Sequence, residues 1–211
     1  MTGSEIIADF ELYTSDMTEL SSTAELALLN KIHQRVCAYR PWEFLKKTAS
    51  GTLSTSVPYV ALPSDFGNFS ENNQWTNNAI GIENNASAKV VFIGSGFTPY
   101  QIVNFSDRRQ YYNQNNIAYL DYANQRLVFT VQPASALSYE FDYIAIPADI
   151  LASESPIIPT RFQPVIYHGM VADDNIIQLS DKARSYREEN LGRYNDYLKD
   201  MSYWNSQLLL N

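Results

Sequence analysis

The stretch from Ser138 to Tyr167 constrains the fold most, because the periodicity of the chain changes there. Aromatic residues alternate with acidic ones along Tyr139–Tyr143, the pattern of a strand with one buried face. Prolines at 147, 156 and 159 then interrupt any regular pattern, and a helical period begins at Arg161. The reverse change occurs near residue 50. The sequence therefore predicts a strand-rich block between two helical ends.

This order of elements predicts an α+β fold. We expect an antiparallel β-sheet or a small β-sandwich, inserted between an N-terminal helical segment and a C-terminal helical pair that ends in a long helix. The predicted boundaries are 1–50 for the N-terminal helical segment, 51–158 for the β-rich block and 159–211 for the C-terminal helices and tail. We expect the two helical segments to pack together as one helical domain.

The N-terminal part contains one strong helix signal. Ser22-Thr-Ala-Glu25 fits a capping box, and apolar residues follow it at steps of three and four up to Tyr39. Pro41 then interrupts the helix and can start a second short helix through Lys47. Residues 1–20 are weakly patterned, and 48–56 are small and polar, which favours a transition into strands.

The central block predicts several short strands. Val57–Phe66 contains two prolines, which favours an edge or irregular strand, and 89–93 predicts a buried strand that ends at the turn Gly94-Ser-Gly96. Residues 100–105 predict a further strand, and 117–122 with 126–131 predict a hairpin. The Asn-rich stretch Gly67–Ser87 predicts a long loop, with a short strand near Ile80–Ile82.

The C-terminal part predicts two helices. The first is expected from about Arg161 to Gln178, and the second begins near Ser180. Apolar residues in the second helix form a stripe that continues to Met201, flanked by the charge pair Glu189–Arg193. This stripe predicts a helix of about 25 residues, or roughly 38 Å.

The net negative charge argues against nonspecific binding to nucleic acid. The net charge is −8, and residues 51–159 carry four Lys/Arg against nine Asp/Glu, so we assign the acidity to the β block. No stretch approaches 18 apolar residues, so no membrane span is predicted. The start of the chain lacks a signal-peptide pattern and Cys37 is the one cysteine, so we expect a protein that folds in a reducing host cytoplasm.

The chain offers no catalytic constellation, so we expect neither an enzyme nor a cofactor. His33 and Cys37 stand four residues apart on a predicted helix, but a zinc site needs three or four ligands and no further cluster follows. His168 lies among apolar residues, which favours a histidine in the core or in an interface. The adjacent carboxylates Asp173–Asp174 and Glu188–Glu189 diverge on a helix, which favours solvated faces.

Two groups of residues indicate partners. An apolar triplet stands at the end of the chain, where chains usually fray, and aromatic residues precede it. Two adjacent arginines in the β block favour pairing with carboxylates of another subunit over single-strand binding. The predicted partner interface is therefore Tyr203, Trp204, Leu208, Leu209, Leu210, Arg108 and Arg109.

The order of motifs over residues 20–205 resembles the head-to-tail adaptor (connector) proteins of tailed bacteriophages. The resemblance begins with the capped helix and Pro41-Trp-Glu-Phe-Leu45, then Tyr59-Val-Ala-Leu-Pro-Ser-Asp-Phe66 and the Asn-rich β insertion. It continues through Tyr139-Glu-Phe-Asp-Tyr-Ile-Ala-Ile-Pro147, the segment Pro156–Tyr167 and the long Tyr-rich helix.

The resemblance implies a structural protein of the virion neck. Such adaptors form a homo-oligomeric ring, typically a dodecamer, beneath the portal protein. Their helical part docks on the portal, often through the C-terminal segment, and the β part contacts neighbouring subunits and tail proteins. Viral DNA passes through the lumen without sequence-specific binding. On this interpretation Pro147, Pro156 and Pro159 stiffen the junction between two interfaces.

The alternative from a different class is a carbohydrate-binding β module with helical packing. Aromatic side chains of the Asn-rich region and its neighbours would stack on sugar rings. The residues concerned are Trp75, Tyr100, Tyr111 and Tyr112.

Overall fold

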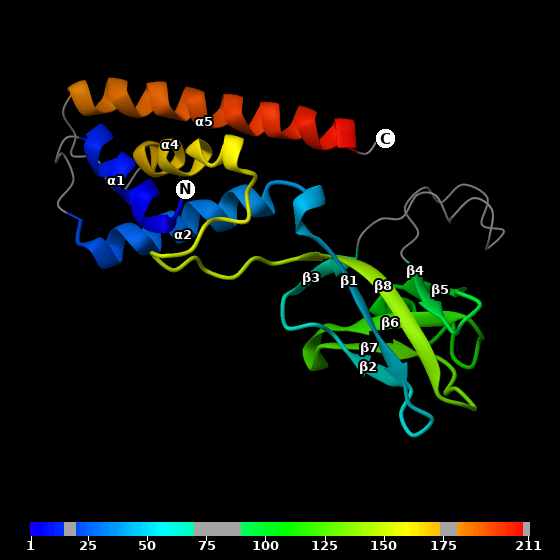
Figure 1. Ribbon diagram of the computed structural model, residues 1–211. Helices are drawn as coiled ribbons and strands as arrows, with labels where there is room; N and C mark the ends of the chain where they lie inside the picture. Colours follow the sequence, from blue (N-terminus) through cyan, green and yellow to red (C-terminus); the bar gives the residue numbers. More distant parts are fainter. Residues whose placement is uncertain (15–19, 70–89, 174–180, 209–211) are drawn as a thin grey trace. The chain divides into compact units, whose positions relative to one another are not determined.

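The computed structural model describes residues 1–14, 20–69, 90–173 and 181–208. The chain divides into two compact units, which are drawn in Figure 1. The helical unit comprises Met1–Leu45 and Ile146–Asn211, and the sheet unit comprises Lys46–Ala145. The α+β class is confirmed, with a sheet inserted between helices that end in a long one.

The helical unit is built around helix α4 (Pro164–Ala172). Helices α1 (Gly3–Thr14), α2 (Ser22–Ala38) and α5 (Asp181–Leu208) all pack against α4. Figure 1 shows α4 lying between α2 and α5. Six of the nine α4 residues are buried, because a helix covered on several sides needs apolar residues around most of its circumference.

Two helix predictions near the N-terminus were wrong in detail. Ser21, not Ser22, caps α2, since its side chain accepts a hydrogen bond from the Ala24 amide at 3.3 Å. Glu25 does not reach back to the cap; it is buried, and burial raises its pKa. Residues 1–20, which are weakly patterned, contain α1, whose side chains Ile6 and Phe10 are fully buried.

The second short helix predicted after Pro41 is only the 3₁₀ turn η1 (Glu43–Leu45). Trp42 is buried before it, and its indole donates to the Val36 carbonyl at 2.8 Å. Strand β1 (Lys46–Leu53) follows immediately, where the sequence predicted a polar transition. The residues of β1 have weak intrinsic preference for strands, so we attribute their extended conformation to pairing with β8, which involves all eight residues.

The proline-containing segment 146–159 belongs to the helical unit. Asn30 of α2 makes two hydrogen bonds with Ile150, accepting from its amide at 2.6 Å and donating to its carbonyl at 3.1 Å. The amides of Gly3 and Ser4 bond to the carbonyls of Glu154 and Ala152. Pro156 is buried within this unit, so the prolines at 156 and 159 lie inside one unit and not between two. The 3₁₀ turn η4 (Thr160–Phe162) then leads into α4.

The sheet unit contains one eight-stranded sheet in the order β1-β8-β4-β5-β6-β7-β2, with β3 also paired to β8. The remaining strands are β2 (Tyr59–Ala61), β3 (Phe66–Phe69), β4 (Val90–Ile93), β5 (Thr98–Val103), β6 (Ile117–Asp121), β7 (Arg126–Phe129) and β8 (Leu137–Ala145). The 3₁₀ turns η2 (Phe105–Asp107) and η3 (Tyr122–Asn124) lie between strands. All pairs are antiparallel except β5 with β6, so the sheet is mixed.

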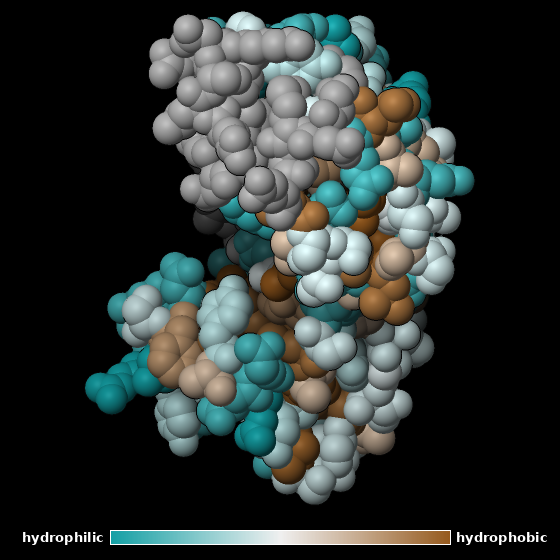
Figure 2. Space-filling model, turned by 90° about the vertical axis from the view of Figure 1, so that its left-hand side faces the viewer, coloured by the Kyte–Doolittle hydropathy of each residue, from teal (hydrophilic) through white to brown (hydrophobic). Residues whose placement is uncertain are grey.

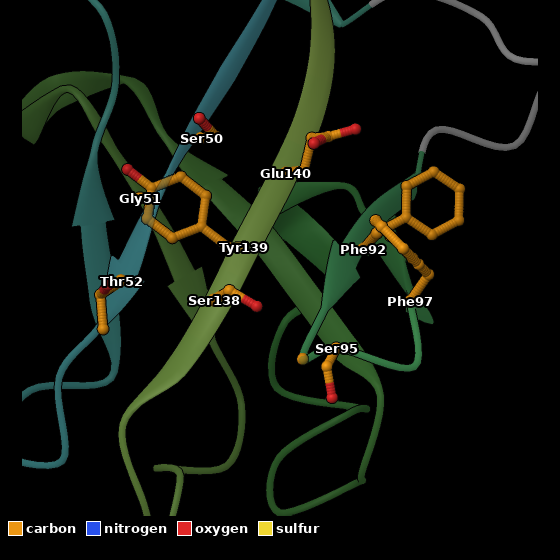
Figure 3. Close-up of a pocket in the computed structure, with 10 residues that line it drawn as sticks. Ser50, Gly51, Thr52, Phe92, Ser95, Phe97, Ser138, Tyr139 and Glu140 are labelled. Atoms are coloured by element: carbon orange, nitrogen blue, oxygen red, sulfur yellow. The ribbon is translucent and has the colours of Figure 1, made fainter.

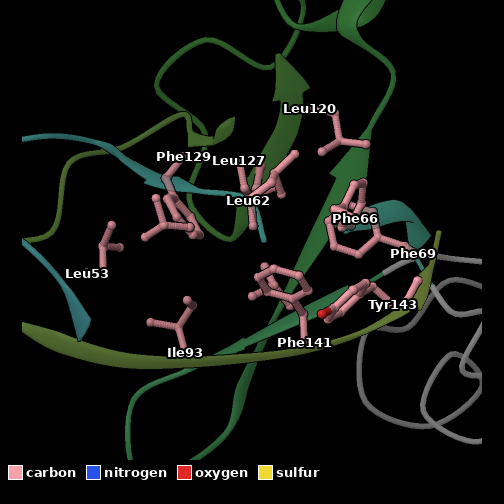
Figure 4. Packing of buried hydrophobic residues seen from close by; sticks show 14 residues of the cluster. Leu53, Leu62, Phe66, Phe69, Ile93, Leu120, Leu127, Phe129, Phe141 and Tyr143 are labelled. Carbon is pink, nitrogen blue, oxygen red and sulfur yellow. The ribbon is translucent and has the colours of Figure 1, made fainter. Parts of the chain in front are cut away.

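The core of the sheet unit lies inside the curved sheet, where the labelled side chains of Figure 4 point toward one another. The predicted alternation of β8 is confirmed, with Phe141 and Tyr143 buried and Glu140 and Asp142 exposed. Phe66, Phe69 and Phe141 pack edge to face, with ring centroids 5.1–6.3 Å apart.

Other strand predictions are also confirmed. The hairpin is β6–β7, and β2 lies at one end of the strand order, as its prolines indicated. The strand predicted near Ile80–Ile82 lies outside the described residues. The first C-terminal helix is shorter at its start than predicted, since α4 begins at Pro164, and residues 174–178 lie outside the described part.

The two units differ in charge, and this corrects the assignment of acidity to the β block. The sheet unit carries six Lys/Arg and seven Asp/Glu, whereas the helical unit carries nine and sixteen. The difference arises because Lys46 and Lys47 belong to the sheet unit, while Asp149 and Glu154 belong to the helical unit. The negative charge therefore belongs to the helical unit.

Candidate partner-binding surfaces

The C-terminal part of α5 presents apolar side chains next to an ordered aromatic pair. Tyr203 is 71% exposed and Leu208 is 44% exposed. Trp204 is half-buried, and its ring centroid lies 5.5 Å from that of Phe162. The Arg161 guanidinium lies 4.9 Å from the Trp204 ring centre, within cation–π distance. Trp204 thus anchors the end of α5, and Tyr203 and Leu208 are the accessible residues. Leu209 and Leu210 lie outside the described residues.

The two adjacent arginines of the sheet unit have different environments. Arg108 follows the turn η2, and its guanidinium lies 3.7 Å from the ring centre of Phe105 and donates to the Phe105 carbonyl at 2.6 Å. Arg109 is exposed and has no hydrogen-bond or ion-pair partner among the described residues. Arg108 therefore holds the local turn together, while the charge of Arg109 remains accessible.

A pocket of about 380 Å³ lies on the sheet unit and was not predicted from the sequence. Figure 3 shows residues of β1, β8 and the β4–β5 turn around it. Phe92 and Phe97 supply aromatic walls and Glu140 supplies an exposed carboxylate, whereas the ring of Tyr139 stacks on the core residue Phe141. The other lining residues are small or polar: Ser50, Gly51, Thr52, Gly94, Ser95 and Ser138.

The turn beside this pocket has an unusual backbone. Gly94-Ser-Gly96 is the predicted turn, with Gly94 at φ 75°, but the next residue, Phe97, also has a positive φ, of 50°. Left-handed backbone is unfavourable for a bulky residue, at a cost on the order of 1–3 kcal/mol. Phe97 is nevertheless 55% exposed, with its ring against Phe92 at 6.3 Å. The turn thus holds an exposed aromatic ring at the edge of the pocket.

His33 and Cys37 are both buried on α2. Burial lowers the pKa of His33 to about 4 and raises the pKa of Cys37 to about 12. Both His33 ring nitrogens lack a hydrogen-bond partner among the described residues. In the same part of the chain, no group of three or more His, Cys, Asp or Glu side chains is placed to hold a metal ion.

His168 is a core histidine, as its apolar surroundings indicated. Its Nδ1 lies 2.7 Å from the Oδ1 of Asn190 on α5, and both residues are buried. Burial lowers the pKa of His168.

The two carboxylate pairs differ in burial, which the sequence did not predict. Glu188 and Glu189 are exposed, and Glu189 accepts from Arg193 at 2.6 Å, so this pair lies on a solvated face. Asp173, in contrast, is buried and contacts Lys31 at 2.7 Å and Arg35 at 3.7 Å. The solvated-face prediction was wrong for Asp173, because the end of α4 packs against α2.

The aromatic residues of the carbohydrate-binding hypothesis do not form one platform in the described structure. Tyr100 is half-buried and packs edge to face on the core residue Phe129, with ring centroids 5.7 Å apart. Tyr111 is half-buried, whereas Tyr112 is 76% exposed. Trp75 lies outside the described residues.

Apolar surface is dispersed on the face shown in Figure 2, where hydrophobic residues (brown) lie in small groups among hydrophilic and intermediate ones. Of the helices in the described part of the chain, none has the length and apolar character of a membrane span.

Comparison with known proteins gives one clear relationship. The sequence profile of the SU10 adaptor protein family matches residues 1–208, which is nearly the whole chain. Among curated proteins no match was found. The family is one of structural phage adaptors, in agreement with the resemblance to head-to-tail adaptors seen in the sequence. The chain therefore belongs to the SU10 adaptor protein family.

Proposed function

We propose that this protein forms a homo-oligomeric ring, a dodecamer, in the neck of the virion. The ring lies beneath the portal protein and joins it to the tail, and viral DNA passes through its lumen. The observation that carries this proposal is the match to a phage adaptor family over residues 1–208.

The end of α5 supports a docking role for the helical unit. Tyr203 and Leu208 expose apolar surface within the acidic helical unit, and the packing of Trp204 on Arg161 and Phe162 fixes the helix end beside them. Exposed apolar side chains on an ordered helix favour a protein partner, because little conformational entropy is lost on binding. We assign portal docking to this helix end and to the residues that follow it.

The net charge of −8 supports a lumen through which DNA slides. A protein that neutralises few phosphates gains little from counterion release and so binds DNA weakly. The negative charge lies on the helical unit, so weak DNA binding is expected of that unit in particular.

Truncation of the C-terminus tests the docking assignment. Removal of Leu208–Asn211 is expected to weaken binding to the portal ring of the same phage by about tenfold or more, which corresponds to loss of one or two buried apolar side chains. The truncated subunit should keep its circular dichroism spectrum, because Leu208 is exposed. Binding is measured by sedimentation with purified portal rings.

Leu191 offers a matched control on the same helix. Leu191 is 43% exposed and Leu208 is 44% exposed, so Leu191→Ser and Leu208→Ser change similar amounts of apolar surface. Only Leu208→Ser should weaken portal binding. Equal effects of the two substitutions, or full binding by the truncated protein, would contradict docking through the end of α5.

A further inference from the structure

We propose that the pocket of the sheet unit receives the segment Arg109–Tyr112 of a second copy of this chain. This inference rests on the proposed ring and names one contact by which neighbouring subunits would join. The pocket is the one lined by residues of β1, β8 and the β4–β5 turn.

The pocket combines aromatic walls with an available negative charge. Glu140 is exposed, and its carboxylate has no hydrogen-bond or ion-pair partner among the described residues. Phe92, which pairs with Glu140 across β4 and β8, and Phe97 stand beside this carboxylate (Figure 3). This arrangement suits a ligand with a cationic group and an aromatic ring close together.

Gly51 of β1 makes room for the Tyr139 ring, so that this ring packs toward the core and not into the pocket. A side-chain Cβ at this position would lie 2.8 Å from the Tyr139 hydroxyl, closer than such atoms approach in proteins. The Tyr139 ring therefore lies directly against the β1 backbone on the core face, and Ser50, which pairs with Glu140, is a small residue on the pocket face of β1.

The segment after η2 carries the complementary groups. Arg109 is an exposed cation without a partner in the described part of the chain, and Tyr112 is 76% exposed. The neighbouring cation, Arg108, is held by Phe105 and does not compete. Asn113, at φ 61°, turns the chain immediately after Tyr112.

The two surfaces lie toward opposite ends of the same strand pair. The pairing of Ile93 with Thr98 places the β4–β5 turn and the pocket at one end. Val90 pairs with Gln101 at the other end, where the chain leaves β5 for η2 and Arg109. Two different surfaces at opposite ends produce a head-to-tail contact, the kind that generates closed rings of identical subunits.

Charge reversal is the first test of the contact. Arg109→Glu and Glu140→Arg should each lower the association constant of subunits by about tenfold or more, because like charges would then face each other. The double variant should recover at least part of the loss, since the pair is restored in reverse. Ring formation is measured by mass photometry on the full-length protein, alone and with portal rings, after circular dichroism has verified folding.

Cysteine cross-linking is the second test, and the chain is well suited to it. Cys37 is buried with a raised pKa, so it should not react. The double variant Arg109→Cys with Glu140→Cys should give disulfide-linked ladders of subunits under mild oxidation. The control pair Tyr122→Cys with Glu140→Cys, which places a cysteine at another exposed position, in the β6–β7 turn, should not.

The outcomes separate this contact from the ring itself. Failure of the wild-type protein to form rings, alone or on the portal, would overturn both the proposed function and this contact. Rings that form normally in both single charge variants, without cross-linked ladders, would overturn the contact and leave the ring proposal standing.

Discussion

Asp65 links two strands of the sheet through both oxygens of its carboxylate. Its Oδ2 accepts from Lys47 of β1 at 2.6 Å, and its Oδ1 accepts from the hydroxyl of Tyr143 of β8 at 2.8 Å. The hydrogen bonds from Lys47 and Tyr143 hold the pKa of Asp65 below its usual value. Burial, with the bond to Asp65, raises the pKa of Tyr143 to about 12. One carboxylate thus supports the longest strand pair of the sheet.

Two substitutions of Asp65 should destabilise the sheet unit by different amounts. Asp65→Ala should lower the free energy of unfolding by about 2 kcal/mol, because it leaves the buried Tyr143 hydroxyl without an acceptor. Asp65→Asn should cost about 1 kcal/mol, because it keeps an acceptor and loses only the charge. Urea unfolding at pH 7, followed by circular dichroism, measures both values.

The same variants predict a pH dependence. The folded-state pKa of Asp65 is depressed, so its contribution is fully present above the unfolded value of 3.8 and is lost as the pH falls through the folded value. The stability difference between wild type and Asp65→Asn should therefore shrink as the pH falls below about 4. A difference that grew toward low pH would contradict the role given to the carboxylate.

Helix α4 packs closely against its neighbours because residue 169 is a glycine. A Cβ at Gly169 would lie 2.5 Å from the Ile32 side chain of α2 and 2.9 Å from the Tyr194 ring of α5. Both neighbours are buried, so neither can move freely to make room. Glycine at this position therefore permits the close approach of three helices, although glycine has a lower helix propensity than alanine.

Two glycine substitutions should have opposite effects. Gly169→Ala should destabilise the helical unit by about 1–3 kcal/mol, since it overpacks the contact of α4 with α2 and α5. Gly192→Ala, on the exposed face of α5 with no atom within 4 Å of the added Cβ, should stabilise it by about 0.5–1 kcal/mol. Thermal unfolding of both variants measures these effects. An unchanged melting temperature for Gly169→Ala would contradict the prediction, because it would show that α4 can move away from α2 and α5 to accommodate the methyl group.

Elements with a strong local pattern were predicted from the sequence. The alternation of β8, the β6–β7 hairpin and the apolar stripe of α5 each follow from residue order alone. Strand β1 was not predicted, because Lys46–Leu53 has no alternation and becomes a strand through its pairing with β8. Helix α1 was not predicted, because its buried residues Ile6, Phe10 and Thr14 recur only at steps of four and form a narrow stripe.

The candidate surfaces also divide into those that a local sequence pattern predicts and those that depend on the three-dimensional fold. The exposed end of α5 could be predicted, because apolar residues near a chain end are visible in the sequence. The pocket could not, since its walls come from β1, β8 and the β4–β5 turn, which only the strand order brings together. The different environments of Arg108 and Arg109 likewise depend on the geometry of η2.

The chain enters and leaves the sheet unit on neighbouring strands. Lys46, the first residue of β1, pairs with Ile144 near the end of β8, so the two ends of the unit lie roughly 5 Å apart. A unit with adjacent ends can be removed without separating the flanking segments. This arrangement predicts that each unit folds by itself.

Excision tests this independence. With Lys46–Ala145 replaced by a Gly/Ser linker of about four residues, the helical unit should retain a cooperative thermal transition and a helical circular dichroism spectrum. The excised segment should fold separately as a β protein. The helical unit alone should still bind portal rings, and loss of both folding and binding would show that the units depend on each other.

The chain enters and leaves the sheet unit beside the paired residues Lys46 and Ile144, and this also affects how such a protein can diversify. Insertions in the turns of the sheet unit leave the spacing between Leu45 and Ile146 unchanged, so the helices need no compensating mutations. With the helical unit docked on the portal as we propose, the sheet unit could then change with each new tail while the helices remain matched to one portal. The pairing of Lys46 with Ile144 thus provides a natural recombination boundary, at which lineages could exchange one half of the adaptor and keep the other.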